Sequence, residues 1–543
     1  MDNLEPSKVA DHRYYLEGKE GKLLRREACT PGTRVRLLDD IIQWVKNISP
    51  DSPDFYWLFG PAGSGKSTIA YTIANRFEFA GDNHEDVILG GNFFCSRQFE
   101  ETKQSKCIIR TIAYHLALVC KPFADALRFD IVYRDPKAQI DGLLVQPWQA
   151  SKAARDAQAT SPPHYLIVID ALDEIDGEGG LALLSELFKT LNDGTLPGLK
   201  FFATSRQDPG LVERVERFER KQLYRLQDIA KEEAYDDIKT YLTTQLPHFA
   251  NRAEMKELVG SSDGLFIYAA TVVRYLAGYE PDEQEELLER LLSSSDPRVL
   301  QRSLSLLDLL YHQILVELFH EMDELIRARR LRILHTFLCA AERISSIVMA
   351  NLLCPPDKHG PCVQGATALL KGLHAVLYVD ANGHVLSYHK SFSDFIFDRN
   401  RSQEFFCDQA TQHRFLARAC FRVMKGALKF NIAQISSSYI LDKDNLTLRA
   451  SIEQNISAVL AYSCHHWSYH LCAADSESPD PRHESLADFL QLRAIFWIET
   501  MNLLGLGGRC ATILWAAREN VGVVCMRHLN TSHSYIGFSS MLH

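Results

Sequence analysis

The apolar residues of this chain follow one pattern before about residue 209 and another after it. In the first part, short apolar runs alternate with stretches in which apolar residues recur at helical spacing. Strands separated by helices pair in parallel, so the pattern predicts an α/β core whose sheet is buried on both faces. The predicted strands are Phe55–Phe59, Val87–Leu89 with Asn92–Phe94, Tyr165–Ile169 and Lys200–Thr204, and the predicted helices include Leu37–Val45, Ser67–Phe77, Cys107–Cys120 and Leu181–Leu191.

The second part is predicted to be mainly helical, with one hairpin. Two apolar runs, Ala375–Val379 and Val385–His389, are joined by a segment that contains Asn382-Gly383. Asn-Gly favours the positive φ angles of a tight β-turn, so we predict a β-hairpin, and helices followed by a hairpin is the order of a winged-helix domain. From Arg401 onward the pattern is again typical of helices. The helices predicted before the hairpin are Glu232–Gln245, Arg252–Val259, Leu265–Leu276, Glu283–Ser293, Ser303–Phe319 and Arg327–Ala341.

Composition narrows the class of protein. The chain has 543 residues, 46% of them hydrophobic and 24% charged, which is typical of a globular protein with several cores. Its 59 Lys and Arg against 69 Asp and Glu give a net charge of −10, so nucleic acid and anionic membranes are not expected partners. The 13 cysteines are scattered, and neither a signal peptide nor an apolar stretch long enough to span a bilayer occurs. We therefore expect a cytoplasmic protein with reduced thiols.

A phosphate-binding loop is predicted directly after the first strand of the core. Gly60-Pro61-Ala62-Gly63-Ser64-Gly65-Lys66-Ser67, followed by Thr68, fits the pattern G-x-x-x-x-G-K-[ST] and lies between a predicted strand and a predicted helix. Glycines let successive backbone N–H groups point at phosphate oxygens, and the helix N-terminus adds positive potential. Lys66 is expected to reach the β and γ phosphates, and the Ser67 hydroxyl to ligate Mg²⁺.

Further charged residues follow the later strands. Asp170 ends an apolar strand and is the expected second ligand of Mg²⁺. Glu174, with Asp173 as the alternative, is expected to orient an attacking water. Arg206, in Thr204-Ser205-Arg206 after the next strand, is placed to bind the γ phosphate at the carboxyl end of the sheet. The predicted catalytic residues are therefore Lys66, Asp170, Asp173, Glu174 and Arg206.

Together these motifs resemble those of NACHT-domain proteins. NACHT proteins are P-loop ATPases of the signal-transducing STAND class, related to animal NOD-like receptors and abundant in mushroom-forming fungi. Tyr56–Thr68 is similar to the family's first motif, Asp170–Glu174 to its double-acid motif, and Thr204-Ser205-Arg206 to its sensor motif. The resemblance covers about Ala28 to Phe397 and continues loosely beyond. With the apolar pattern it implies an N-terminal segment and pre-core helix (1–54), a NACHT P-loop NTPase core (55–208), a helical domain (209–310), a winged-helix domain (311–400) and a C-terminal helical region (401–543).

The resemblance also assigns roles to residues outside the core. Pro31-Gly32-Thr33-Arg34 is similar to the segment that closes over adenine, so Thr33 and Arg34 are expected near the base. Tyr388–Phe395 resembles the winged-helix motif whose histidine touches the ADP β phosphate in the closed state, which gives that role to His389. Gly264–Tyr268 departs from the family, because it lacks the proline of a Gly-x-Pro motif that packs on adenine. Many fungal relatives carry WD40 repeats, and we expect none here because the chain ends at His543.

Two weaker signals are interpreted as structural. His466 and His470 lie four residues apart on one face of a predicted helix, which is compatible with zinc. Cys464 and Cys472 lack zinc-site spacing, however, so we favour a structural core over a metal site in this segment. The would-be recognition helix at Ser346–Leu353 contains no Lys or Arg, which disfavours a DNA-binding winged helix.

The expected function is a nucleotide-operated signalling switch that binds ATP or ADP with Mg²⁺ and hydrolyses ATP slowly, with GTP as an alternative nucleotide. Exchange of ADP for ATP would remove the His389 contact and open the winged-helix lid. The opened protein would self-associate or pair with other NACHT-type proteins, a role suited to fungal innate immunity or non-self recognition. Two alternatives stay open: a conventional P-loop phosphotransferase, and a regulatory partner of full-length NACHT proteins that lacks a sensor of its own.

Overall fold

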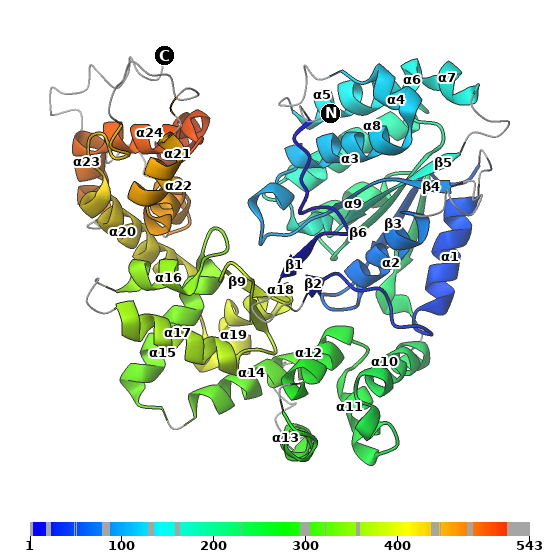
Figure 1. Cartoon of the computed structure of the whole chain (residues 1–543). Coiled ribbons are helices and arrows are strands. Elements are labelled where there is room, and N and C mark those ends of the chain that lie inside the picture. Colours follow the sequence, from blue (N-terminus) through cyan, green and yellow to red (C-terminus); the bar gives the residue numbers. More distant parts are fainter. Residues whose placement is uncertain are drawn as a thin grey trace. The chain divides into compact units, whose positions relative to one another are not determined.

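The protein is described by a computed structural model, which divides into two compact units (Figure 1). The first unit comprises Met1–Gln313, His374–Ala381 and Leu386–Ser391, and the second comprises Ile314–Leu373, Asn382–Val385 and Phe392–His543. Among the described residues, no helix combines the length and the apolarity needed to cross a bilayer. The residues that the structure describes are 4–17, 23–47, 49, 51–78, 87–128, 135–157, 163–229, 231–277, 279–293, 305–320, 322–354, 359–435, 445, 447–474 and 482–518.

A five-stranded parallel sheet forms the centre of the first unit. Its strand order is β4-β5-β6-β3-β7, and every neighbouring pair is parallel. All five carboxyl ends therefore lie at one edge of the sheet, where ligands bind in parallel α/β folds. The strands are β3 (Phe55–Phe59), β4 (Val87–Phe94), β5 (His164–Asp170), β6 (Leu199–Ser205) and β7 (Lys221–Arg225).

Helices cover both faces of this sheet, as the apolar pattern predicts (Figure 1). Successive side chains of a strand point to opposite faces. Phe55 and Trp57 of β3 pack with α3 (Lys106–Val119) and α8 (Gly179–Asn192), whereas Tyr56 and Leu58 pack with α1 (Val35–Lys46) and α2 (Lys66–Glu78). All five residues of β3 are buried, because both of its faces are covered.

Four strands differ from the sequence prediction. The two apolar runs at residues 87–94 form one strand, β4, whose register with β5 shifts between Leu89 and Gly91. Strand β7 is not predicted from the pattern, because its residues are half-buried and it pairs only with β3 at the edge of the sheet. The sheet therefore extends beyond residue 208. A small antiparallel pair, β1 (Tyr15–Glu17) and β2 (Leu23–Arg25), is also absent from the prediction.

The remainder of the first unit is helical. Short helices follow α3, and a second group of helices follows β7. These elements are α4 (Lys121–Ala126), α5 (Pro136–Gln139), α6 (Gln146–Ala150), α7 (Lys152–Asp156), α9 (Pro209–Glu216), α10 (Lys231–Gln245), α11 (Ala253–Ser261), α12 (Phe266–Leu276), α13 (Pro281–Ser293) and α14 (Leu306–Phe319), the last of which continues into the second unit.

The described part of the second unit is mostly helical, and most of the predicted hairpin belongs to the first unit. The hairpin strands are β8 (Leu377–Val379) and β9 (Val385–Ser387), and Gly383 in their connection has a φ of 82°. The end of the predicted C-terminal helical region, residues 519–543, lies outside the described residues. The helices are α15 (Glu324–Cys339), α16 (Ser346–Leu353), α17 (His359–Gly372), α18 (Lys390–Ile396), α19 (Arg399–Ser402), α20 (Gln409–Ala427), α21 (Leu448–Asn455), α22 (Ala458–Cys472), α23 (Arg482–Leu492) and α24 (Ala494–Leu503).

A buried lysine at the start of β6 connects α1 to the sheet. Lys200 Nζ donates hydrogen bonds to Trp44 O at 2.6 Å, to Asn47 O at 2.7 Å and to Ser52 Oγ at 2.8 Å. These three acceptors use all the donors of the ammonium group. The connection matters for the site because α1 follows directly on Arg34, one of the predicted nucleotide-binding residues.

We predict that Lys200→Met lowers the free energy of unfolding by about 2–4 kcal/mol, because two carbonyls and a hydroxyl lose a charged donor while the side-chain volume is kept. Exposed Lys189, which pairs only with Glu186 on its own helix, provides the control. Lys189→Met is expected to change stability by no more than about 0.5 kcal/mol. Equal thermal unfolding curves for the two variants would contradict this role for Lys200.

Candidate functional site

The phosphate-binding loop has the backbone conformation that its glycines predict. Gly63 has a φ of 77° and Gly65 a φ of 90°, and α2 begins immediately afterwards at Lys66. A Cβ on Gly63 would lie 2.0 Å from Ile267 Cγ2. Ile267 N also donates to Gly63 O at 3.0 Å, so α12 rests directly on the loop. Gly63 is therefore required both for its positive φ and for this close packing.

Lys66 is buried and turned back onto its own loop. Its Nζ donates to Gly60 O at 2.9 Å and to Pro61 O at 2.7 Å. Burial lowers the pKa of the Lys66 ammonium to about 8, against the opposing effect of the charges on Asp173 and Asp170. Loop carbonyls thus accept hydrogen bonds from a cation to which charged phosphate oxygens would bind more strongly.

The ends of β5 and β6 are joined through a carboxylate. Asp170 Oδ1 accepts a hydrogen bond from Thr204 Oγ1 at 2.5 Å, and Thr204 Oγ1 accepts one from Ala171 N at 2.9 Å. Burial raises the pKa of Asp170, while the hydroxyls of Thr204 and Ser67 lower it. Ser67 and Asp170, the two predicted magnesium ligands, are therefore in contact.

Asp173 and Glu174, the other two predicted acidic residues, contact different partners. Asp173 Oδ1 accepts from Arg206 N at 2.9 Å, and its Oδ2 lies 3.5 Å from Arg206 Nε. Glu174 Oε2 accepts from Arg97 N at 3.1 Å. Burial raises the pKa of Glu174, with the nearby charge of Lys390 acting in the opposite direction. Because Arg206 engages Asp173, Glu174 is the better placed of the two to act as a base.

The segment predicted to lie near the base is buried against the loop. Thr33 Oγ1 donates to Thr30 O at 2.7 Å, and Arg34 Nη2 donates to Ser64 O at 3.2 Å. The Arg34 guanidinium stacks on the Phe266 ring, with Cζ 4.9 Å from the ring centroid. Its Nε and Nη1 are buried without a hydrogen-bond partner, although Nη1 lies 3.6 Å from Asp237 Oδ2. Of these two atoms, Nη1 is thus ion-paired with Asp237, whereas Nε makes no hydrogen bond to the described residues.

His389 lies two residues beyond the end of β9, not in the hairpin strand as predicted. Strand β9 ends earlier than predicted, at Ser387, and the Ser387 hydroxyl donates to His389 O at 2.8 Å. Ser391 N donates to His389 Nδ1 at 3.1 Å, and the Ser391 hydroxyl lies 2.6 Å from the same nitrogen. Nδ1 is thus an acceptor, so the proton of the neutral ring is assigned to Nε2.

Positive charges surround His389. Burial, together with the charges of Arg206, Lys66, Arg274 and Lys390, lowers its pKa to about 3. The imidazole is therefore neutral at physiological pH. The effect of these charges also shows that His389 lies near Lys66 and Arg206, which are far from it in sequence.

The segment that carries His389 is held to other parts of the first unit by polar contacts. Gln98 Nε2 donates to Ser387 O at 3.0 Å, and Ser387 N donates to Gln98 Oε1 at 3.1 Å. Arg274 Nε donates to Ala375 O at 2.9 Å, and its guanidinium stacks on Tyr388 at 4.5 Å. Lys390, next to His389, contributes a charge near Glu174.

Most of the predicted site residues lie together at the carboxyl edge of the sheet or on the loop beside it. Sequence reasoning missed Arg97, Gln98, Asp237 and Arg274. No motif marks the first three, and only the helical spacing of 265–276 places Arg274 on a helix. Ile267 and Phe266 belong to the segment that lacks the family's proline, yet that segment still contacts the loop. The residues gathered by the loop itself are Gly60, Pro61, Ala62, Gly63, Ser64, Gly65, Lys66, Ser67 and Thr68.

The donors present fit a phosphate chain with a magnesium ion. A Cβ on Gly65 would meet no atom within 4 Å, so the loop leaves open space at the start of α2. Lys66 and the N-terminus of that helix suit anionic oxygens. The hydroxyl of Ser67 and the carboxylate of Asp170 are the hard oxygen ligands that Mg²⁺ prefers.

Comparisons with known proteins agree with a P-loop region but are distant. The family described as "Nephrocystin 3, N-terminal" matches residues 32–206, less than half of the chain. No curated protein sequence matches.

Three solved structures are similar to parts of the chain. The Walker-type ATPase paby2304 of Pyrococcus abyssi has 13% identity and a TM-score of 0.32 over 68% of this chain and 97% of that one. Drosophila ORC bound to DNA has 13% identity and a TM-score of 0.28 over 69% and 95%. The ADP form of the Aeropyrum pernix ORC2 protein has 14% identity and a TM-score of 0.29 over 64% and 86%. These scores are too low to support an argument about the fold. The parallel sheet is established by its own strand order and register.

The pKa of His389 gives a prediction for the nucleotide-free protein. In the unfolded chain a histidine titrates near 6.5, whereas folding lowers the pKa of His389 to about 3. As the pH falls below about 6.5, the unfolded state gains a proton that the folded state does not, so stability is lost. Between pH 7 and pH 5 the wild type should lose about 2 kcal/mol more than His389→Gln. Thermal unfolding at the two pH values measures this, and parallel losses would contradict the burial of a neutral His389.

Proposed function

We propose that the protein is a nucleotide-operated switch of the NACHT type, in which a bound ADP fastens the segment around His389 to the P-loop core. The single observation that supports this most strongly is the convergence of Lys66, Arg206 and His389 on one edge of the sheet. A P-loop alone is common to many ATPases. A lid over phosphates requires a group from a distant segment that can contact them. Neutral, buried His389, close to the cations of the site, is such a group.

The groups that would bind the phosphates make hydrogen bonds within the protein in this structure. Lys66 Nζ would exchange the carbonyls of Gly60 and Pro61 for phosphate oxygens. Ser67 and Asp170 would hold Mg²⁺, which neutralises phosphate charge when bound. Thr33 and Arg34 would lie near the base, where Arg34 Nε would donate to a ring or ribose acceptor. Such a donor would suit adenine or guanine, so ATP and GTP are both candidates.

Hydrolysis by this arrangement would be slow. Glu174 is the proposed residue that orients water, and its raised pKa makes it a stronger base once ionised. Its carboxylate already accepts from Arg97 N, and Arg206 is engaged by Asp173. Both groups must change partners before they can act on a γ phosphate. Slow turnover suits a switch, because hydrolysis then only resets the state.

The lid would respond to the nucleotide through the orientation of His389. Tyr311 OH lies 2.7 Å from Ser391 Oγ, which in turn contacts His389 Nδ1. These hydroxyls keep Nδ1 as the acceptor and leave Nε2–H as the donor for an anionic oxygen. A switch needs a difference in affinity between its two states. ADP would supply it by bonding His389 in the closed state, and exchange for ATP would open the lid for self-association.

Release of ADP tests this lock. A fluorescent ADP analogue is displaced by excess ADP, and the release rate is followed by stopped flow. We predict that His389→Ala speeds release by about 10-fold or more, because a hydrogen bond to a charged phosphate is lost. Gln98→Ala should speed it by about 3–10-fold, because the two hydrogen bonds to Ser387 are lost while the phosphate contacts remain.

Gln146→Ala is the matched control, since Gln146 bonds only exposed Asp141 and should leave the rate unchanged. Unchanged release from both His389→Ala and Gln98→Ala would refute the lock. Mass photometry of the same proteins should show larger assemblies with ATP than with ADP. Rapid ATP turnover by a persistent monomer would instead favour the phosphotransferase, and assembly only with a longer NACHT protein would favour the regulatory partner.

A further inference from the structure

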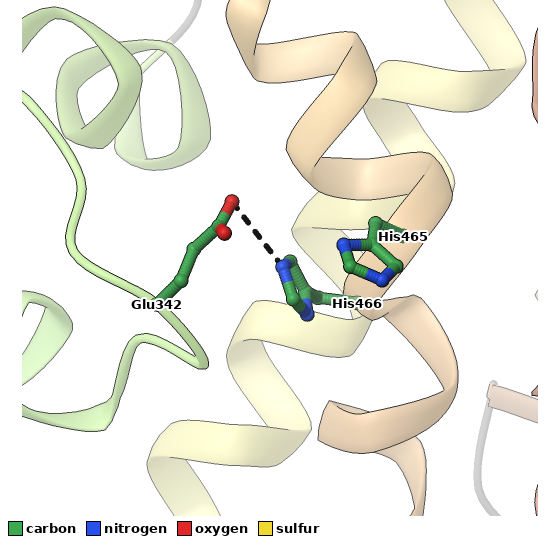
Figure 2. Close-up of side chains that lie close together, drawn as sticks. All are labelled: Glu342, His465 and His466. Atoms are coloured by element: carbon green, nitrogen blue, oxygen red, sulfur yellow. Dashed lines mark ion pairs between the residues drawn. The ribbon is translucent and has the colours of Figure 1, made fainter. Parts of the chain in front are cut away.

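Three potential metal ligands from two segments meet in the second unit. Glu342 lies between α15 and α16, and His465 and His466 are adjacent on α22. Figure 2 shows the Glu342 carboxylate facing the His466 ring, with the His465 ring beside His466. One ligand atom from each residue lies within 4.8 Å of the other two. Within the described residues, this group is separate from the nucleotide site, which belongs to the first unit.

His466 is the best-defined member of the group. The residue is only 5% exposed, and its Nε2 lies 3.3 Å from Glu342 Oε1. The same Nε2 is buried without a hydrogen-bond partner. The His466 ring is also fixed between Tyr462 and His465, with ring centroids at 4.9 Å and 4.2 Å. A buried polar atom that faces a carboxylate but makes no hydrogen bond is costly unless something completes the pair.

The other residues that suggest zinc in this segment are used elsewhere. Both nitrogens of His470 are engaged, Nδ1 at 2.8 Å from His413 Nδ1 and Nε2 at 2.8 Å from Tyr462 OH. Burial raises the pKa of the Cys464 thiol, which opposes the thiolate that a metal needs. The structure thus supports a core role for His470 and Cys464, as the sequence favoured, but separates His466 from them.

We propose that Glu342, His465 and His466 bind a divalent transition-metal cation of the zinc class, with water completing the coordination. Imidazole and carboxylate are ligands that this class accepts. With bonds of about 2.0 Å and tetrahedral angles, two ligand atoms on one ion lie about 3.3 Å apart. The His466–Glu342 pair already has this spacing. Glu342 is 40% exposed at its side chain, which leaves a path for the ion to enter.

Arg509 opposes the metal through His465. Arg509 Nη1 lies 2.5 Å from His465 Nε2, and a guanidinium can only donate, so Nε2 is the acceptor and Nδ1 carries the proton of the neutral ring. A metal on Nδ1 would displace that proton to Nε2, where it would face the donor of Arg509. Binding must therefore release Arg509. If the side chain at position 509 instead accepted a hydrogen bond from His465 Nε2–H, the protein should bind the metal more tightly.

Cobalt titration of the full-length protein tests the proposal. The protein is freed of metal with a chelator and kept reduced, and Co²⁺ binding is followed by visible absorption, with Zn²⁺ added to displace it. We predict one site whose spectrum lacks a thiolate-to-cobalt band. His465→Gln and His466→Gln should each weaken binding by about 100-fold or more, and Glu342→Gln by about 10-fold. Arg509→Gln should tighten it, because a glutamine oxygen can accept from His465 Nε2–H.

His320→Gln is the control, because exposed His320 lies in the same unit outside the group. Circular dichroism checks that each variant is folded, and half-buried His465 keeps the test valid if His466→Gln unfolds. Equal affinities for wild type, His465→Gln and His466→Gln would show that His466 and Glu342 form an ion pair only, which overturns the site. Unchanged binding by His465→Gln, together with unchanged or weaker binding by Arg509→Gln, would exclude His465 as a ligand and overturn the three-residue site.

Discussion

Buried positive charge at the carboxyl edge of the sheet is the constraint on which the proposed site depends. Lys66, Arg206 and Lys390 come from three distant segments, and together with burial their charges depress the pKa of His389 to about 3. Loop carbonyls accept from Lys66, Asp173 pairs with Arg206, and Glu174 lies near the charge of Lys390. An anion with several charged oxygens would offset the repulsion among these cations. In this view the phosphates would supply the negative charge that holds the loop and the lid segment together.

The sheet makes this concentration of charge possible. Parallel pairing brings every strand end to one edge, and buried residues on both faces of β3 keep the strands in register. The hydrogen bond between Thr204 and Asp170 ties two of those ends together. Gly63 and Ile267 then bring α12 onto the loop, and Arg274 of α12 holds the hairpin segment that precedes His389. Contacts around the proposed nucleotide site thus reach the segment of His389 both through α12 and through Gln98, which follows β4.

The sequence predicted the parts of this arrangement that depend on local pattern. The buried strands are visible because continuous apolar runs are needed where both faces are covered, and the loop is visible because its glycines need positive φ. Strand β7 escaped notice because an edge strand with half-buried residues has no such run. Asp237, Gln98 and Arg97 also escaped notice, since each acts through a backbone group or side chain brought close only by folding. The same holds for Glu342, which shares no motif with the histidines that it faces. The roles of the predicted site residues stay predictions until a nucleotide is measured.

That measurement is the identity and amount of nucleotide that the purified protein carries. The wild type and Lys66→Ala are denatured in parallel, and the released small molecules are separated and quantified by liquid chromatography and mass spectrometry. The account predicts close to one nucleoside diphosphate per wild-type chain and none above background from Lys66→Ala, because the loop lysine is lost. Equal nucleotide in the two proteins would contradict the phosphate site. So would a wild type that carries none and binds neither added ADP nor ATP.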